Sequence, residues 1–189
     1  MAPDIDSGYT PYTLTVDDVL RVLWRGLLPV SAATLGVHLL VWGLPALDPS
    51  AWVAGGLWLM LAYVIAVVAH EALHVLPMFA FGIRWSDLKF GIRWRDGVVF
   101  VHGGKPVSAR AYRIILSTPG IVLGVLPALY GIGTGAGWIT LFGWLMLVSA
   151  VGDWAVLRLI RRLPPDTPVT DHPSEVGCLV AKPPEIPQE

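Results

Sequence analysis

Four long apolar runs, separated by short polar or glycine- and proline-rich stretches, dominate the pattern along the chain. They cover residues 26–47, 51–82, 114–132 and 138–160. Each is close to or above the roughly 20 residues that an α-helix needs to cross a membrane. Thr15 precedes two acidic residues and is expected to cap the helix that enters the first run. The pattern predicts an all-α membrane protein, a bundle of about four transmembrane helices.

Between the second and third runs the pattern changes from helical to alternating. Residues 88–95 alternate between apolar and charged side chains, Asp96-Gly97 is typical of a two-residue hairpin turn, and residues 98–102 predict a returning strand. We expect a β-hairpin over residues 87–102. Its turn would pair Ile92 with Val101 and Trp94 with Val99.

The composition supports the membrane assignment. Of the 189 residues, 54% are hydrophobic and only 14% are charged, whereas soluble domains carry about 25% charged residues. A net charge of −1, without a basic patch, argues against nucleic-acid binding. Cys178 is the only cysteine, which excludes a disulfide framework and a cysteine-based zinc site.

Lysine and arginine flank only one end of the predicted bundle. They lie in residues 21–25, 84–95, 110–113 and 158–162, while the turns at the other end contain none. The positive-inside rule then places both termini and the hairpin in the cytoplasm.

We expect three regions along the chain. A polar N-terminal segment covers residues 1–20, of which residues 1–14 are expected to be poorly ordered. A membrane-embedded domain covers 21–163, and a proline-rich cytoplasmic tail, expected to be soluble or irregular, covers 164–189.

A His-Glu-x-x-His sequence lies within the second run. His70 and His74 are four residues apart, so both imidazoles lie on one helical face and can reach one ion. Glu71 lies beside that ion, where it can accept a proton from water at the metal. Three ionisable residues in five intramembrane positions carry a cost of about 2.5–3.5 kcal/mol each, which a metal site would offset. The alternative is a pair of core histidines with Glu71 in a wet cavity.

A catalytic zinc needs a third protein ligand and an open position. Asp153 in the fourth run is the best candidate, because it lies at a similar depth to His74, and Gly152 would let the fourth helix approach the second closely. Otherwise Asp153 is a buried carboxylic acid or pairs with Arg158. His102 is the rival ligand, although we expect it to contact substrate.

Two other histidines are weaker candidates. His38 is expected to be packed or to face a cavity. His172, in Asp171-His172-Pro173, either approaches the site or belongs to a surface turn.

With these residues in place, the chain resembles the family named "putative zincin peptidase", which consists of small bacterial integral membrane proteins, and is more distantly similar to site-2 proteases. The resemblance covers about residues 64–180. It rests on His70-Glu71-x-x-His74, Val99-Phe100-Val101-His102, Pro106, Tyr112, Ser117-Thr118-Pro119, Gly152-Asp153, Asp171-His172-Pro173 and Gly177.

The resemblance implies one zinc ion per chain on His70 and His74, with Glu71 as catalytic base. Asp153 matches the later Asp of site-2 proteases, although here Gly precedes that residue instead of following it. It also implies a bacterial cytoplasmic membrane and a hairpin that holds an extended substrate.

The primary hypothesis is a zinc-dependent intramembrane endopeptidase whose partners are the lipid bilayer and membrane proteins or peptides as substrates. Two alternatives stay open: a non-proteolytic subunit or scaffold of a membrane complex that retains a zinc site, and a zinc hydrolase of a small amphiphile. A membrane complex or homo-oligomer is compatible with each of them.

Overall fold

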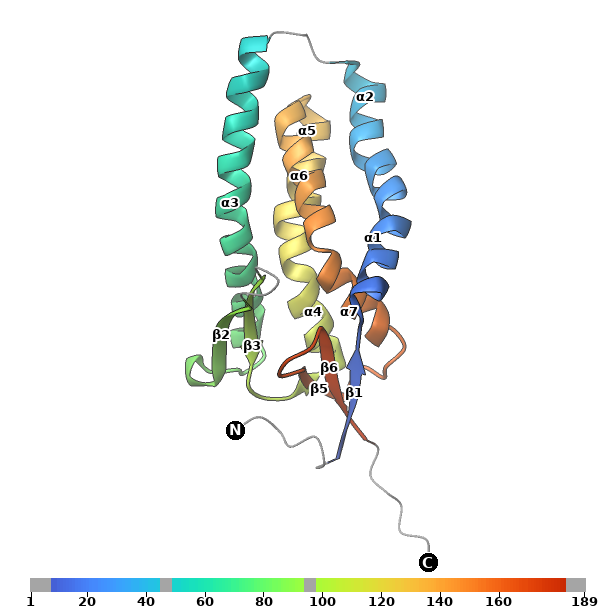
Figure 1. Ribbon diagram of the computed structural model, residues 1–189, viewed down its shortest axis with the longest axis vertical. Helices are drawn as coiled ribbons and strands as arrows, with labels where there is room; N and C mark the ends of the chain where they lie inside the picture. The colour runs from blue at the N-terminus through green and yellow to red at the C-terminus, as the bar shows by residue number, and fades with distance from the viewer. Residues whose placement is uncertain (1–7, 45–48, 94–97, 183–189) are drawn as a thin grey trace, which may run out of the picture.

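The computed structural model describes residues 8–44, 49–93 and 98–182. Its long helices stand side by side, and short strands gather at one end of them (Figure 1). The helical elements are α1 (Val16–Ser31), η1 (Ala32–Gly36), α2 (Val37–Trp42), α3 (Pro49–Ala80), η2 (Trp85–Asp87), α4 (Ala109–Pro119), η3 (Gly120–Val125), α5 (Leu126–Thr134), α6 (Gly137–Ser149) and α7 (Val151–Ile160). The strands are β1 (Tyr9–Thr13), β2 (Leu88–Arg93), β3 (Val98–Gly103), β4 (Val107–Ser108), β5 (Pro168–Asp171) and β6 (Gly177–Ala181).

Three helical stretches are long and apolar enough to cross a membrane: Val16–Trp42, Pro49–Ala80 and Ala109–Thr134. α6 and α7 meet the same test together, but they are bent by 50° relative to each other. A mostly helical chain with three candidate membrane spans is therefore confirmed, and a bundle of four spans stays a prediction. The predicted fourth span, residues 138–160, is interrupted in the structure: α6 ends at Ser149 and α7 begins at Val151.

The outward faces of these helices are apolar. In α3, the side chains of Trp58, Val68 and Leu76 are each more than 60% exposed. A soluble monomer rarely exposes a continuous apolar surface of this size, whereas a lipid-facing helix requires one. The exposure pattern is that of a membrane protein.

The sequence around Thr15 starts α1 as expected. The Thr15 hydroxyl accepts a hydrogen bond from the Asp18 backbone N–H at 3.2 Å, and the Asp18 carboxylate accepts one from the Thr15 N–H at 3.0 Å. This reciprocal pair is a capping box, which satisfies two backbone N–H groups at the helix start. α1 therefore begins well before the apolar run does.

Gly82 ends α3 and turns the chain toward the hairpin. Its φ of +85° is a left-handed conformation that glycine adopts without strain. The N–H of Gly82 donates to Phe79, and that of Ile83 donates to Met78, which is the Schellman pattern of a helix C-terminus. Met78 and Ile83 are buried in the same apolar cluster.

β2 and β3 form the expected antiparallel hairpin, but in a different register. Ile92 pairs with Val99, and Phe90 pairs with Val101, so the predicted pairing of Ile92 with Val101 was wrong by two residues. The predicted pairing of Trp94 with Val99 and the Asp96-Gly97 turn involve residues outside the described ranges. A shift of two keeps Phe90 and Val101 on the same face, as predicted.

The two terminal regions pair with each other, which the sequence did not lead us to expect. β1 pairs with β6, β6 with β5 and β5 with β4, all antiparallel, in a four-stranded sheet of order β1-β6-β5-β4. The expectation of a poorly ordered N-terminal segment was therefore wrong for residues 9–13. In the tail, where a soluble or irregular segment was expected, residues 168–171 and 177–181 form regular strands.

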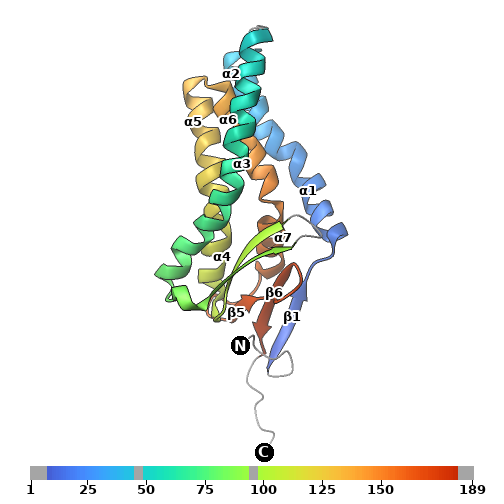
Figure 2. The ribbon, with the colours of Figure 1, turned by 60° about the vertical axis from the view of Figure 1, so that its left-hand side comes forward.

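One carboxylate joins this sheet to the hairpin and to α4. Asp171 in β5 accepts hydrogen bonds from the Gly103 N–H in β3 at 2.8 Å and from the Tyr112 hydroxyl in α4 at 2.7 Å. Figure 2 shows the hairpin lying between the helices and the terminal sheet. The carboxylate thus fixes the base of the hairpin relative to the helices.

The terminal sheet predicts an unreactive thiol. Cys178 in β6 is fully buried; burial raises the pKa of this thiol to about 12, and the Asp171 carboxylate acts in the same direction. Because the thiolate is the reactive form, maleimide at pH 8 should label the native protein about a thousandfold more slowly than the unfolded chain. Mass spectrometry of timed samples measures both rates.

The matched control moves the thiol to an exposed position in the same region, in the double variant Cys178→Ala/Ser174→Cys. This variant should label rapidly in the native state. Equal labelling rates for it and for the native wild type would contradict a folded terminal sheet.

Candidate metal centre

α3 brings the His-Glu-x-x-His residues together on one side of the helix. The ligand atoms of His70, Glu71 and His74 all lie within 4.8 Å of one another, and the two imidazole rings are 5.1 Å apart between centroids. His74 is buried, and the other two side chains are partly buried. This is the geometry that the four-residue spacing predicts.

A carboxylate from a distant part of the chain meets both histidines. Asp153 Oδ2 lies 2.8 Å from His70 Nε2, and Asp153 Oδ1 lies 3.6 Å from His74 Nε2. All three side chains are less than 20% exposed. The structure thus brings the three predicted ligands to one place, with both Nε2 atoms directed toward one carboxylate.

The break between α6 and α7 determines where Asp153 lies. Because α7 begins at Val151, the carboxylate is in the first turn of a helix, where the helix dipole favours a negative charge. The next residue, Trp154, donates from its indole N–H to the Leu147 carbonyl at 3.0 Å. Its ring packs against Gly120, where a Cβ atom would clash with it.

Gly152 does not have the role we expected of it. A Cβ atom at this position would meet no atom within 4 Å, so Gly152 does not provide a close approach between helices. Gly120 in η3 provides one, through its contact with Trp154. The close contact that holds α7 is therefore with the third span.

A proline in the third span explains how His74 is oriented. Nδ1 of His74 donates to the backbone carbonyl of Ile115 at 3.0 Å. In a regular helix that carbonyl would accept the N–H four residues later, but the residue there is Pro119, which has no N–H. Since a carbonyl can only accept, Nδ1 carries the proton and Nε2 is left with a free lone pair, as a metal ligand requires.

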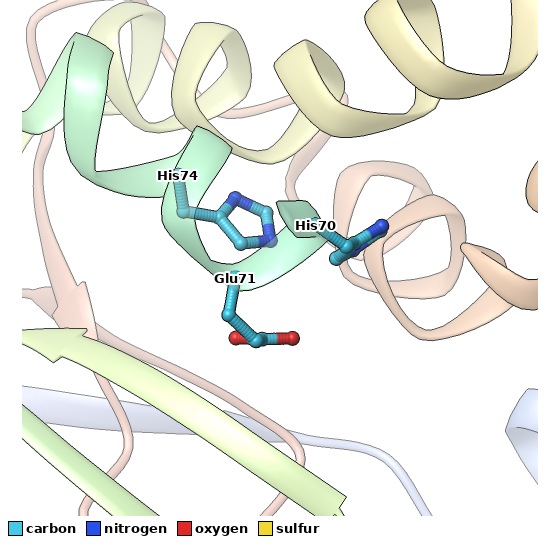
Figure 3. A group of neighbouring side chains, drawn as sticks. All are labelled: His70, Glu71 and His74. Atoms are coloured by element: carbon cyan, nitrogen blue, oxygen red, sulfur yellow. The ribbon is translucent and has the colours of Figure 1, made fainter. Parts of the chain in front are cut away.

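Glu71 points away from the helices and toward the hairpin (Figure 3), and the backbone N–H of Val101 hydrogen-bonds to its carboxylate. The Val101 side chain packs with Val75 and Ile115 in the cluster beneath the site. The hairpin edge that carries Val101 therefore borders the site directly.

The far end of α7 is fixed by Arg113 of α4. Its guanidinium donates to the carbonyls of Ile160 at 2.8 Å and Leu163 at 2.6 Å. These carbonyls belong to the last turn of α7 and the residues after it, which lack helical partners. From the sequence, Arg113 was predicted only as a positive charge at the end of a span. Nothing in its sequence position indicates that it hydrogen-bonds to the end of α7.

The other candidate histidines lie elsewhere among the described residues. His102 is paired with Lys89 in the hairpin, and strand alternation puts its side chain on the face opposite Val101. His172 Nδ1 accepts the Glu175 N–H at 2.9 Å within a turn, as the turn alternative predicts, but its side chain is buried and does not lie at the surface. His38 is buried, lies 3.0 Å from the Thr140 hydroxyl and lines a cavity of about 540 Å³.

Comparison with known families agrees with this geometry. A family model described as "Putative zincin peptidase" matches residues 63–168. The chain belongs to this family. The match begins shortly before His70, includes Asp153 and ends at Pro168. Among curated proteins and solved structures, the comparisons found no match.

The residues present fit the zinc that this family name implies. Two imidazole nitrogens and one carboxylate are a donor set that zinc accepts, and a carboxylate base adjacent to them is the second feature of a zincin. The orientation of His74 by a backbone carbonyl adds the outer support that metal-binding histidines generally have.

Replacing Pro119 tests this support. In Pro119→Ala, the new backbone N–H competes for the Ile115 carbonyl, so His74 loses its fixed orientation. The affinity for zinc should fall by about 10- to 100-fold. Titration with a competing chelator measures it in the purified, zinc-loaded protein.

Pro127→Ala is the matched control, because it makes the same change in α5 of the same span, where the proline is in the first turn. Pro127→Ala should keep the wild-type affinity. The same loss in both variants would show that a general change in the third span is responsible.

Proposed function

We propose that this chain is a zinc-dependent intramembrane endopeptidase that cleaves peptide bonds in or near membrane segments of protein substrates. The observation that carries the proposal is the contact of Asp153 in α7 with His70 and His74 in α3. It joins the His-Glu-x-x-His sequence to a third donor on another apolar helix, which is the ligand number of a catalytic zinc site.

His70, His74 and Asp153 would hold the metal. Zinc, when bound, polarises a carbonyl oxygen and lowers the pKa of a coordinated water toward neutrality. The chain itself supplies the fixed direction of each donor: His74 through the Ile115 carbonyl, and Asp153 through the start of α7.

Glu71 would act as the general base. Its carboxylate is next to the imidazoles but is directed toward the hairpin, so it faces the side from which a peptide would approach. It would take a proton from the attacking water and then pass it to the nitrogen of the leaving amine.

The hairpin provides a place for an extended substrate. Within the described residues, β2 and β3 form a two-stranded sheet, so one edge of β3 is not paired with another strand. On that edge, the Val101 and Gly103 N–H groups point toward Glu71 and Asp171. A substrate segment that adds to this edge as a strand would pass directly beside Glu71.

This binding mode limits which substrates are cleaved. A membrane helix has all its backbone groups hydrogen-bonded internally, so it must unwind before it can pair with β3. Spans that contain glycine or proline unwind most readily and are the expected substrates. His102, on the other face of the hairpin strand, stays a proposed substrate contact.

The distribution of charge supports an orientation in a bacterial cytoplasmic membrane. The strands lie at one end of the helices, and the connections at the other end, residues 43–50 and 134–137, contain no lysine or arginine. The positive-inside rule puts the strands, the hairpin and both termini in the cytoplasm.

The Glu71→Gln variant tests the proposed base. The amide cannot accept the proton, while His70, His74 and Asp153 are unchanged. Peptide hydrolysis should fall by at least about a hundredfold, with the zinc content unchanged. Mass spectrometry of a panel of single-span peptides in detergent micelles measures cleavage, and elemental analysis measures zinc.

Glu175→Gln, which makes the same change in the exposed turn of the tail, should leave cleavage at the wild-type rate. Zinc-dependent cleavage that survives in Glu71→Gln would rule out the base. A zinc-loaded wild type that cleaves no peptide would instead favour a scaffold, or, if it hydrolyses small amphiphiles, a hydrolase of that class.

A further inference from the structure

A cavity of about 350 Å³ lies between the start of α1 and the end of α7, away from the metal site. Five arginines line it: Arg21, Arg25, Arg158, Arg161 and Arg162. Arg21 and Arg25 are one helical turn apart on α1. Arg158 lies on α7, and Arg161 and Arg162 follow it by three and four residues, just beyond the end of that helix. Both helices therefore direct positive charge into the same space.

This positive charge is poorly balanced within the protein. Asp18 is the one acidic residue in the lining, and its carboxylate already pairs with Arg21 at 3.1 Å and caps α1. Among residues 8–44, 49–93 and 98–182, no carboxylate lies within 4.0 Å of the guanidinium groups of the other four. Five arginines and one aspartate give the cavity a formal charge of +4, although the whole chain carries −1.

A second cavity continues from the first along the same pair of helices. Its volume is about 220 Å³, and it shares Val22 with the arginine cavity. Its lining is entirely apolar except for the Trp154 indole, and it includes Gly26 and Val30 on α1 and Val148 and Val151 on α6 and α7. Along α1 the chain thus passes from a cationic cavity to an apolar groove within about two helical turns.

We propose that these two cavities form one binding site for an anionic phospholipid. The arginine cavity would bind the phosphate, because guanidinium groups match phosphate oxygens in charge and geometry. The apolar groove would hold the start of an acyl chain. Basic pockets between spans on the cytoplasmic side are typical sites for anionic lipid headgroups, and this one lies where the first predicted span begins and the last one ends.

The groove is what distinguishes a lipid from a soluble phosphate compound. A free phosphate or a phosphorylated metabolite would use the arginines alone and leave the apolar groove without a role. An amphiphile uses both cavities. Its charged headgroup would lie in the arginine cavity, and its apolar chain would lie in the adjoining groove.

Charge removal is the first test. The full chain is purified in detergent, incubated with phosphatidylglycerol or phosphatidylcholine, and analysed by native mass spectrometry for retained lipid. Arg25→Gln/Arg158→Gln should weaken retention of phosphatidylglycerol by roughly fivefold per arginine, about 25-fold for the pair. Phosphatidylcholine should be retained weakly by every variant.

Arg84→Gln/Arg110→Gln is the matched control, since it removes two exposed arginines from the same end of the molecule but outside the cavity. This pair should retain phosphatidylglycerol as the wild type does. An equal loss in both pairs would overturn the site, because it would show general attraction between a basic surface and an anionic lipid.

Filling the groove is the second test. A Cβ atom at Gly26 would meet no atom within 4 Å, so Gly26→Phe starts its side chain in open space beside the groove. Gly56→Phe adds the same group to an open position on α3. Gly26→Phe should weaken phosphatidylglycerol retention, and Gly56→Phe should not. Unchanged phosphatidylglycerol retention in Gly26→Phe would overturn a lipid site. So would soluble glycerol phosphate that binds to the wild type as tightly as phosphatidylglycerol does and binds equally to Gly26→Phe and Gly56→Phe.

Discussion

Polar groups between apolar helices must find partners within the protein, because lipid offers none. The contact of His70 and His74 with Asp153 meets this requirement for three ionisable side chains at once. It joins the second span to the bent fourth segment. Without it, α7 would carry an unpaired carboxylate into an apolar environment, and the Nε2 atoms of both imidazoles on α3 would lose their partner.

The third span supports this contact from the side through two residues close together in its sequence. Pro119 leaves the Ile115 carbonyl free for His74, and Gly120 leaves room for the Trp154 ring beside Asp153. One Pro-Gly pair therefore orients one histidine and positions the carboxylate. The strands at one end of the helices then reach the site: Asp171 fixes the base of the hairpin, and β3 reaches Glu71.

Local patterns predicted the parts of this structure that depend on neighbouring residues. The four-residue histidine spacing, the Thr15 cap and the end of the second run at residue 82 are all short-range features, and the structure has each of them. Asp153 could be selected because depth along a helix follows from residue number. The rise per residue of a continuous helix, however, does not reveal the break at Ala150. The sequence analysis therefore did not predict that Asp153 lies in the first turn of a separate helix, α7.

The long-range features could not be predicted in the same way. The sheet joins β1 to β6 from opposite ends of the chain, and neither strand alternates clearly enough to reveal a partner. The hairpin register differs by two residues because alternation fixes the face of each side chain but not the pairing. The hydrogen bond from His74 to the Ile115 carbonyl had a partial signal in the sequence. Pro119, four residues after Ile115, shows that this carbonyl lacks its helical N–H partner, but it does not show that His74 on another span would replace it.

The most direct test of the account is the zinc content of purified Asp153→Ala and His102→Ala protein, with Asp166→Ala as a control at an exposed aspartate of the loop before β5. Elemental analysis after loading should find about one zinc per chain in the wild type, His102→Ala and Asp166→Ala, and much less in Asp153→Ala. Full zinc in Asp153→Ala together with its loss in His102→Ala, or no zinc in the wild type, would contradict the site assembled by α3 and α7.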